Sequence, residues 1–183
     1  MTLEHARRLM HKWISNEALR VHAECVAACM VSYAKQYEPE QQERWQVCGM
    51  LHDLDWERHP TREEHPFVAV KHLRELGVDE EILTAILGHA EYSGTPRTTA
   101  MAKALFATDE LAGFIVACAK VRPNGIADLE PKSVKKKLKD KAFAAAVSRE
   151  DIANGIRELG VDETQHIARC IDAIRAEKDR LGV

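Results

Sequence analysis

The stretch TAMAKALFATDELAGFIVACAK (residues 99–120) carries the longest helix-patterned run of apolar residues in the chain. Its apolar side chains recur every three to four residues, which is the spacing of one face of an α-helix. Thr98 or Thr99 stands where a helix-capping residue belongs. No part of the sequence alternates apolar and polar residues with the β-branched and aromatic enrichment of a strand. The sequence therefore predicts an all-α protein.

Helical spacing continues on both sides of this stretch. The sequence Leu-Gly-Val-Asp occurs twice, at residues 76–79 and 159–162. We interpret both copies as one kind of helix-to-helix turn, with a left-handed glycine at the helix end and an aspartate that caps the next helix. The lysine-rich segment Lys132–Lys141 follows a break in the pattern at residues 122–128. The other expected helices cover about residues 16–33, 39–52, 66–76, 80–89, 148–159 and 163–174.

The size of the chain favours one hydrophobic core. With 183 residues, of which 45% are hydrophobic, the chain can bury one sizeable core and only marginally two. We therefore expect a single helical domain over residues 1–183, with a core at residues 16–122. Residues 131–183 are expected to form a C-terminal helical extension, with a helical hairpin packed on that core.

Charge and cysteine content exclude several classes of partner. The formal net charge of -3 gives no field that would attract a nucleic acid polymer or an anionic membrane. No apolar run approaches the roughly 18 residues of a membrane span. The five cysteines are odd in number and scattered, which suits reduced thiols in a reducing compartment. We expect a cytoplasmic protein.

Three ionisable residues fall on helix faces that are otherwise apolar. These are His22, His89 and Asp109. Burying an unpaired carboxylate costs several kcal/mol or forces it to protonate, so such groups need partners. A shared metal ion would satisfy all of them at once.

Further histidines and aspartates complete an ordered set along the chain. The pair His52-Asp53 stands where a helix gives way to a polar segment, and at an opened helix end both side chains can turn to one ion. The stretches that carry the set are Arg20-Val-His22, Gly49-Met-Leu-His52-Asp53-Leu54, Glu64-His65-Pro66, Ile86-Leu-Gly-His89 and Ala107-Thr-Asp109-Glu-Leu111.

In these stretches, from about residue 16 to residue 120, the chain resembles the HD superfamily of metal-dependent phosphohydrolases, and in particular its dinuclear branch. The resemblance implies a helical bundle that holds two metal ions, with Asp53 as the ligand that bridges them. The implied ligands are His22, His52, Asp53 and Asp109 for one ion, and Asp53, His65 and His89 for the other.

The ligand chemistry fits two divalent transition metal ions. Imidazole with carboxylate favours Fe, Mn, Co, Ni or Zn over Ca or Mg. Two ions that share a carboxylate can activate a water at neutral pH. The implied activity is hydrolysis of a phosphoester or phosphoanhydride in a small phosphorylated metabolite or nucleotide.

Residues near the His-Asp pair are candidates for further roles. Asp55 stands where many HD proteins have glycine, and Asp55 or Glu57 would serve as general base if only one ion were bound. We expect Arg58 and Arg97 to bind substrate phosphate. The lysines of Lys132–Lys141 form a solvated helix face or, alternatively, a rim that attracts a polyanionic substrate.

Other interpretations of these residues remain open. His59 competes with His65 for the same ion, whereas Cys25 and Cys29 fit small core residues better than zinc ligands. A di-iron HD protein that uses oxygen would carry the same ligands. A ligand-sensing domain that keeps metal only for stability is the third alternative.

Overall fold

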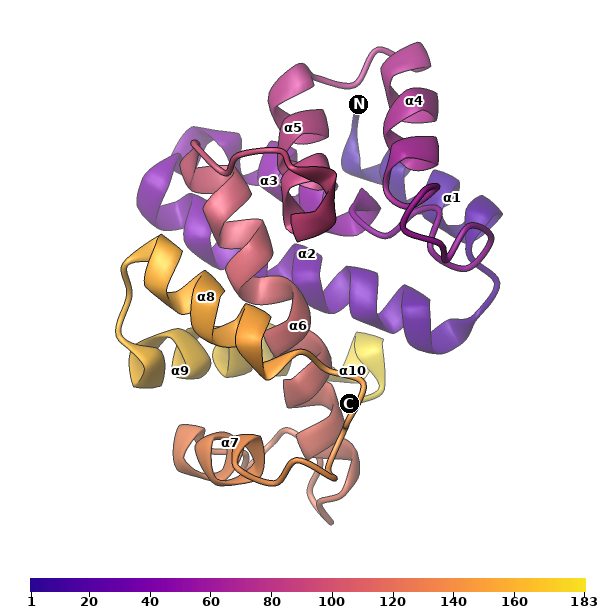
Figure 1. Cartoon of the computed structure of the whole chain (residues 1–183). Helices are drawn as coiled ribbons and strands as arrows, with labels where there is room; N and C mark the ends of the chain where they lie inside the picture. Colours follow the sequence, from indigo (N-terminus) through magenta and orange to yellow (C-terminus); the bar gives the residue numbers. More distant parts are fainter.

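The computed structural model describes residues 1–183 and contains ten α-helices, two short 3-10 turns and no strand (Figure 1). The all-α prediction is confirmed. The elements are α1 (Leu3–Trp13), α2 (Glu17–Tyr37), η1 (Pro39–Gln41), α3 (Gln42–Leu51), α4 (Phe67–Glu75), α5 (Glu80–His89), η2 (Glu91–Ser93), α6 (Ala100–Lys120), α7 (Pro131–Leu138), α8 (Arg149–Leu159), α9 (Glu163–Ala176) and α10 (Lys178–Leu181).

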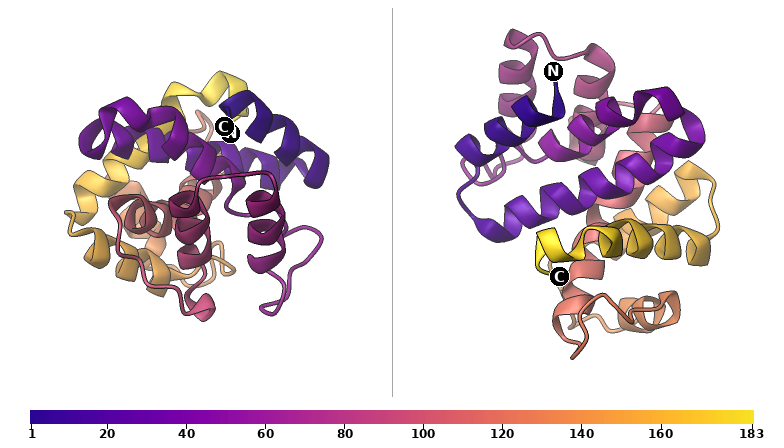
Figure 2. Two further views of the ribbon diagram at one scale, coloured as in Figure 1. Left: turned by 90° about the horizontal axis from the view of Figure 1, so that it is seen from above. Right: turned by 180° about the vertical axis from the view of Figure 1, so that it is seen from behind.

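The two longest helices, α2 and α6, organise the bundle. They cross near the centre of the molecule, with α3 packed on α2, α5 and α8 packed on α6, and α9 in contact with both (Figure 1). Seen from behind, α9 lies along α2, so the C-terminal hairpin of α8 and α9 covers one side of this crossing (Figure 2). The largest fully buried side chains of the core include Tyr33 from α2, Trp45 from α3 and Phe114 from α6.

Helix starts follow the expected caps. The side chains of Asn16, Asp79, Thr99, Ser148 and Asp162 each accept a hydrogen bond from a backbone N–H in the first turn of the following helix. Such bonds satisfy donors that have no partner within the helix.

Both Leu-Gly-Val-Asp segments form the predicted turn. Gly77 and Gly160 have φ values of 73° and 71°, in the left-handed region that glycine adopts without steric cost. Helix α1 was not predicted, because basic residues interrupt its short apolar pattern. The structure buries only Ala6 and Met10 from this helix.

Two glycines allow the helices that frame the functional site to approach closely. A Cβ atom at Gly49 in α3 would lie 2.8 Å from the Cα of Ala27 in α2, and one at Gly155 in α8 would lie 2.6 Å from the Cα of Ala107 in α6. Neither backbone leaves room for a side chain. The positions of α3 and α8 relative to α2 and α6 are therefore fixed by direct backbone packing.

All five cysteines are buried and unpaired. Cys29 contacts the carbonyl oxygen of Cys170 through its Sγ atom, and Cys25 lies in the same hydrophobic core. This agrees with the interpretation of Cys25 and Cys29 as core residues. None of the helices is both long enough and apolar enough to cross a membrane.

Candidate metal centre

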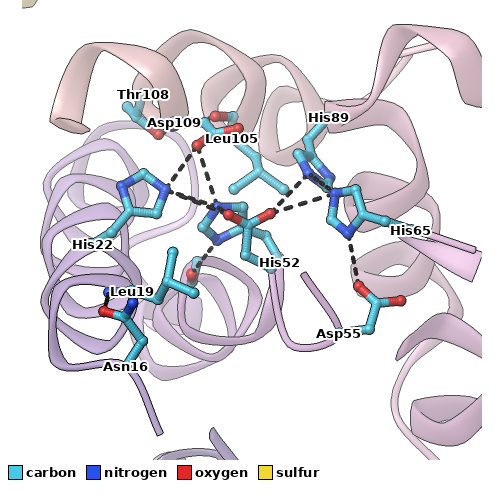
Figure 3. A network of polar contacts seen from close by, with 12 residues as sticks. Asn16, Leu19, His22, His52, Asp55, His65, His89, Leu105, Thr108 and Asp109 are labelled. Carbon is cyan, nitrogen blue, oxygen red and sulfur yellow. Dashed lines mark hydrogen bonds and ion pairs between the residues drawn. The ribbon is translucent and has the colours of Figure 1, made fainter. Parts of the chain in front are cut away.

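Six side chains from five parts of the chain converge where α2, α3, α5 and α6 meet (Figure 3). His22 lies in the second turn of α2, His52 and Asp53 follow the end of α3, and His89 ends α5. The remaining two members of the set are His65, in the connection between α3 and α4, and Asp109, in α6.

The six side chains form two groups, and the first consists of His22, His52, Asp53 and Asp109 around one oxygen of the Asp109 carboxylate. Oδ1 of Asp109 lies 3.0 Å from Nε2 of His22 and 3.3 Å from Nε2 of His52. The two Nε2 atoms are themselves 3.2 Å apart. Oδ2 of Asp53 lies 3.5 Å from Nε2 of His52 and 3.8 Å from Nε2 of His22. All four side chains thus present one donor atom each to a common point.

The second group consists of Asp53, His65 and His89, and it surrounds the other oxygen of the Asp53 carboxylate. Oδ1 lies 3.5 Å from Nε2 of His65 and 3.4 Å from Nε2 of His89, and these nitrogens are 3.2 Å apart. The carboxylate of Asp53 therefore divides its two oxygens between the two groups.

In three of the four histidines, Nδ1, which points away from the group, pairs with a hydrogen-bond acceptor. Nδ1 of His52 pairs with the carbonyl oxygen of Gly49 at 2.8 Å, and Nδ1 of His89 pairs with the carbonyl oxygen of Ile86. When Nδ1 of a neutral imidazole donates, its Nε2 carries a lone pair. In the second group, His65 and His89 both pair through Nδ1 with an acceptor, so in their neutral forms both Nε2 atoms present lone pairs beside Asp53. A cation is the partner that such a set fits.

His65 is held in the same way by a carboxylate. Its Nδ1 lies 2.7 Å from Oδ1 of Asp55, whose Oδ2 accepts a hydrogen bond of 2.7 Å from the backbone N–H of Ala69. Asp55 is fully buried and lies behind His65, away from the site itself (Figure 3). This position fits a residue that orients His65, and it gives Asp55 no access to a water as general base.

The charges within the site shift the pKa values of its members strongly. Burial opposes ionisation of Asp53 and Asp109, but the adjacent His52 holds the pKa of both carboxyls well below the usual range. Burial likewise disfavours protonation of His52, but Asp53 and Asp109 together raise its pKa well above the usual value. Both carboxylates are thus ionised at neutral pH, as metal ligation requires.

A cleft of about 870 Å³ opens onto the two groups. Trp56, Tyr92 and Arg62 line it beside His65, where Arg62 lies 5.4 Å from the centre of the Tyr92 ring. Burial, reinforced by the neighbouring Asp109, raises the pKa of the cleft residue Glu110 to about 7. The other acidic side chains of the lining, apart from the proposed ligands, are Glu91, Glu150 and Asp151.

Three residues predicted to act in the site lie elsewhere. Glu57 binds the backbone and hydroxyl of Ser15 and the backbone N–H of Asn16, and so secures the turn between α1 and α2. Arg58 donates to the carbonyl oxygen of Lys12 at 2.6 Å and lies over the Trp13 ring.

Arg97 does not line the cleft, although it contacts two lining residues, Phe106 and Glu91. It binds both carboxylate oxygens of Glu158 at 2.7 Å and the carbonyl oxygen of Gly88, and it stacks 3.7 Å from the centre of the Phe106 ring. These contacts tie the loop after α5 to α8. His59, the alternative to His65, pairs with Glu64 and is not among the grouped ligands.

Comparison with known families agrees with the geometry. The family model described as HD domain matches residues 20–113, which is more than half of the chain and includes all six grouped residues. No curated protein and no solved structure gave a significant match. HD domains bind divalent metals, and most members of the superfamily are metal-dependent phosphohydrolases. The chain belongs to the HD domain family.

Proposed function

We propose that this protein is a phosphohydrolase that uses two divalent transition metal ions. The observation that carries the proposal is the divided carboxylate of Asp53, with Oδ2 toward His22 and His52 and Oδ1 toward His65 and His89. A carboxylate placed in this way can bridge two ions, and no protein nucleophile is needed for a hydrolysis that such ions support.

The residues divide the work as follows. When bound, the two ions would supply a water of lowered pKa and positive charge for the phosphoryl oxygens. His22, His52 and Asp109 would hold the first ion, while His65 and His89 would hold the second. Arg62, the one cationic side chain of the cleft, would contact the substrate phosphate.

The cleft favours a small substrate with a single phosphoryl group. Glu91, Glu110, Glu150 and Asp151 line its walls, against the one lining guanidinium of Arg62. Of these four, only Glu91 has an ion-pair partner, Arg97 at 3.2 Å. A long polyphosphate chain would extend from the ions toward these carboxylates, and like charges brought together in this way cost binding energy. We therefore expect a compact phosphomonoester rather than a polyphosphate.

Metal analysis and a phosphate-release screen test the proposal. We expect one to two equivalents of a transition metal per chain after metal-replete expression. Phosphate should be released from some member of a panel of sugar phosphates, nucleoside monophosphates and other small esters, and chelation should abolish the release. Less than about a tenth of an equivalent of metal would contradict the proposal, as would iron-dependent oxygen consumption without phosphate release.

Asp55 offers a separate test of the second ion position. Asp55→Ala removes the partner of Nδ1 of His65, so we expect the metal content to fall toward one equivalent and the rate to fall about 10- to 100-fold, as when outer support of a ligand is lost. Asp55→Asn keeps one acceptor oxygen and should lie between Asp55→Ala and wild type. Asp128→Ala, at an exposed aspartate, is the control. Full metal content and rate in Asp55→Ala would contradict the positioning role.

A further inference from the structure

A second pocket, of about 640 Å³, lies between α7 and α8 and extends to the start of α9. It shares no lining residue with the metal cleft. Helix α8 separates the two, since Glu150 and Asp151 line the cleft whereas Ile152 and Ile156 line the second pocket. Figure 1 shows α7 at the end of the molecule remote from α4 and α5. The lysines of α7 therefore do not form a rim of the metal cleft.

The lining of this pocket, called the lysine pocket below, is strongly basic. Lys132, Lys135, Lys136, Lys139 and Arg149 face a single carboxylate, that of Glu163. Lys135 is neutralised by Glu163 at 2.7 Å. Lys132, Lys136 and Lys139 are exposed and make no ion pair.

The three lysines without an ion pair lie on one side of α7. Lys132 and Lys136 belong to the helix, and Lys139 is the residue that follows its last turn. They follow one another at intervals of four and three residues, so their charged ends lie on the same side of the helix. Like charges at this spacing destabilise a helix. Helix α7 has only eight residues and buries only Val134, so it has little packing to offset that repulsion. A bound polyanion would relieve it.

The floor of the lysine pocket is apolar. Leu138 from α7 and Ile152, Ala153 and Ile156 from α8 provide it. A pocket of this volume lies in the range of small-molecule sites, which combine an apolar lining with a few charged groups that fix the ligand. A ligand that uses both parts has several negative charges at one end and a planar or apolar group at the other.

We propose that the lysine pocket binds a nucleoside di- or triphosphate, as a site separate from the metal centre. The phosphates would lie among Lys132, Lys136 and Lys139, and the base would lie against Ile152 and Ile156. A volume of about 640 Å³ suits a small-molecule ligand such as a free nucleotide better than a nucleic acid strand. The acidic walls of the metal cleft, in contrast, disfavour a triphosphate.

Calorimetric titration of the metal-loaded protein with the non-hydrolysable ATP analogue β,γ-methylene-ATP tests the proposal. The triple variant K132Q/K136Q/K139Q should bind the analogue at least tenfold more weakly than wild type. The control K12Q/K35Q/K71Q removes the same charge at exposed lysines outside the pocket and should bind as wild type does. Adenosine and inorganic pyrophosphate, titrated separately, should each bind more weakly than the analogue.

Three results would overturn the proposal. The first is equal affinity in wild type and K132Q/K136Q/K139Q, and the second is an equal loss in the control, which would indicate attraction to net charge alone. The third is tighter binding of a short single-stranded oligonucleotide than of the analogue, dependent on the same lysines. Metal content and hydrolysis are measured separately in both variants, and we expect both to be unchanged. Failure here would therefore leave the proposed hydrolase function untouched.

Discussion

The variant Asp53→Ala should lose more activity than any other single substitution, with hydrolysis falling by roughly a thousandfold or more. Loss of a residue that supports one metal ion lowers metal affinity or activity by about 10- to 100-fold. Asp53 is the only residue that belongs to both groups. Its loss would leave His22 and His52 with Asp109 as their sole carboxylate, and His65 and His89 with none. We expect the metal content to fall in the same preparation.

Measured metal per chain and rate on the best substrate of the panel check this expectation. Asp172→Ala is a suitable control, because Asp172 is an exposed residue of α9 whose only partner is Arg175, within the same helix. It should keep wild-type metal and activity. Wild-type metal content together with a wild-type rate in Asp53→Ala would show that the bridging assignment is wrong.

The variants His65→Ala and His89→Ala should separate the two ion positions. The first position has His22, His52 and Asp109 in addition to Asp53, whereas the second has only His65 and His89. The second position thus has only two residues that it does not share with the first, and removal of either leaves it incomplete. We expect the metal content to fall toward one equivalent and the rate to fall by about a hundredfold or more, the upper end of the range for damaged metal support.

The fold should survive both substitutions, because the first group remains complete. Circular dichroism and thermal unfolding would establish this before metal is measured. His59→Ala is the matched control, since His59 pairs with Glu64 outside the two groups and should be dispensable. Two equivalents of metal and a near-normal rate in the His65 and His89 variants would indicate a site with one essential ion.

Residues whose role depends on local sequence were predictable. The caps Asp79 and Thr99 each act on a helix that starts at the next residue, so short-range chemistry identifies them. His22, His89 and Asp109 stood out because an ionisable group interrupts an otherwise apolar helix face. The structure brings all three into the two groups of His and Asp side chains.

Residues whose role depends on distant partners were not predictable. Arg97 was expected to bind a substrate phosphate. Its partner in the structure, Glu158, lies 61 positions further along the chain, and no local sequence pattern predicts that contact. Glu57 binds the turn at Ser15, 42 positions away. Arg62, which lines the cleft, was not singled out because a single arginine in a polar segment gives no periodic signal. Its position three residues before His65 was the one available clue.

One wall of the metal cleft is formed by a segment to which a single guanidinium makes four hydrogen bonds. Residues 141–147 form turns rather than a helix, and Ala146 and Val147 of this segment line the cleft. The Arg149 guanidinium donates to the carbonyl oxygens of Asp140, Phe143, Ala144 and Val147 and lies 4.8 Å from the centre of the Phe114 ring.

Because one guanidinium binds four carbonyls, displacement of the Arg149 side chain would break all four contacts together. The segment should therefore open as one cooperative unit, at a free energy below that of global unfolding. Its amides would then exchange with solvent at a common rate, and a protease would cut there before it cut the helices. Such an opening would widen the cleft while leaving the six grouped residues in place.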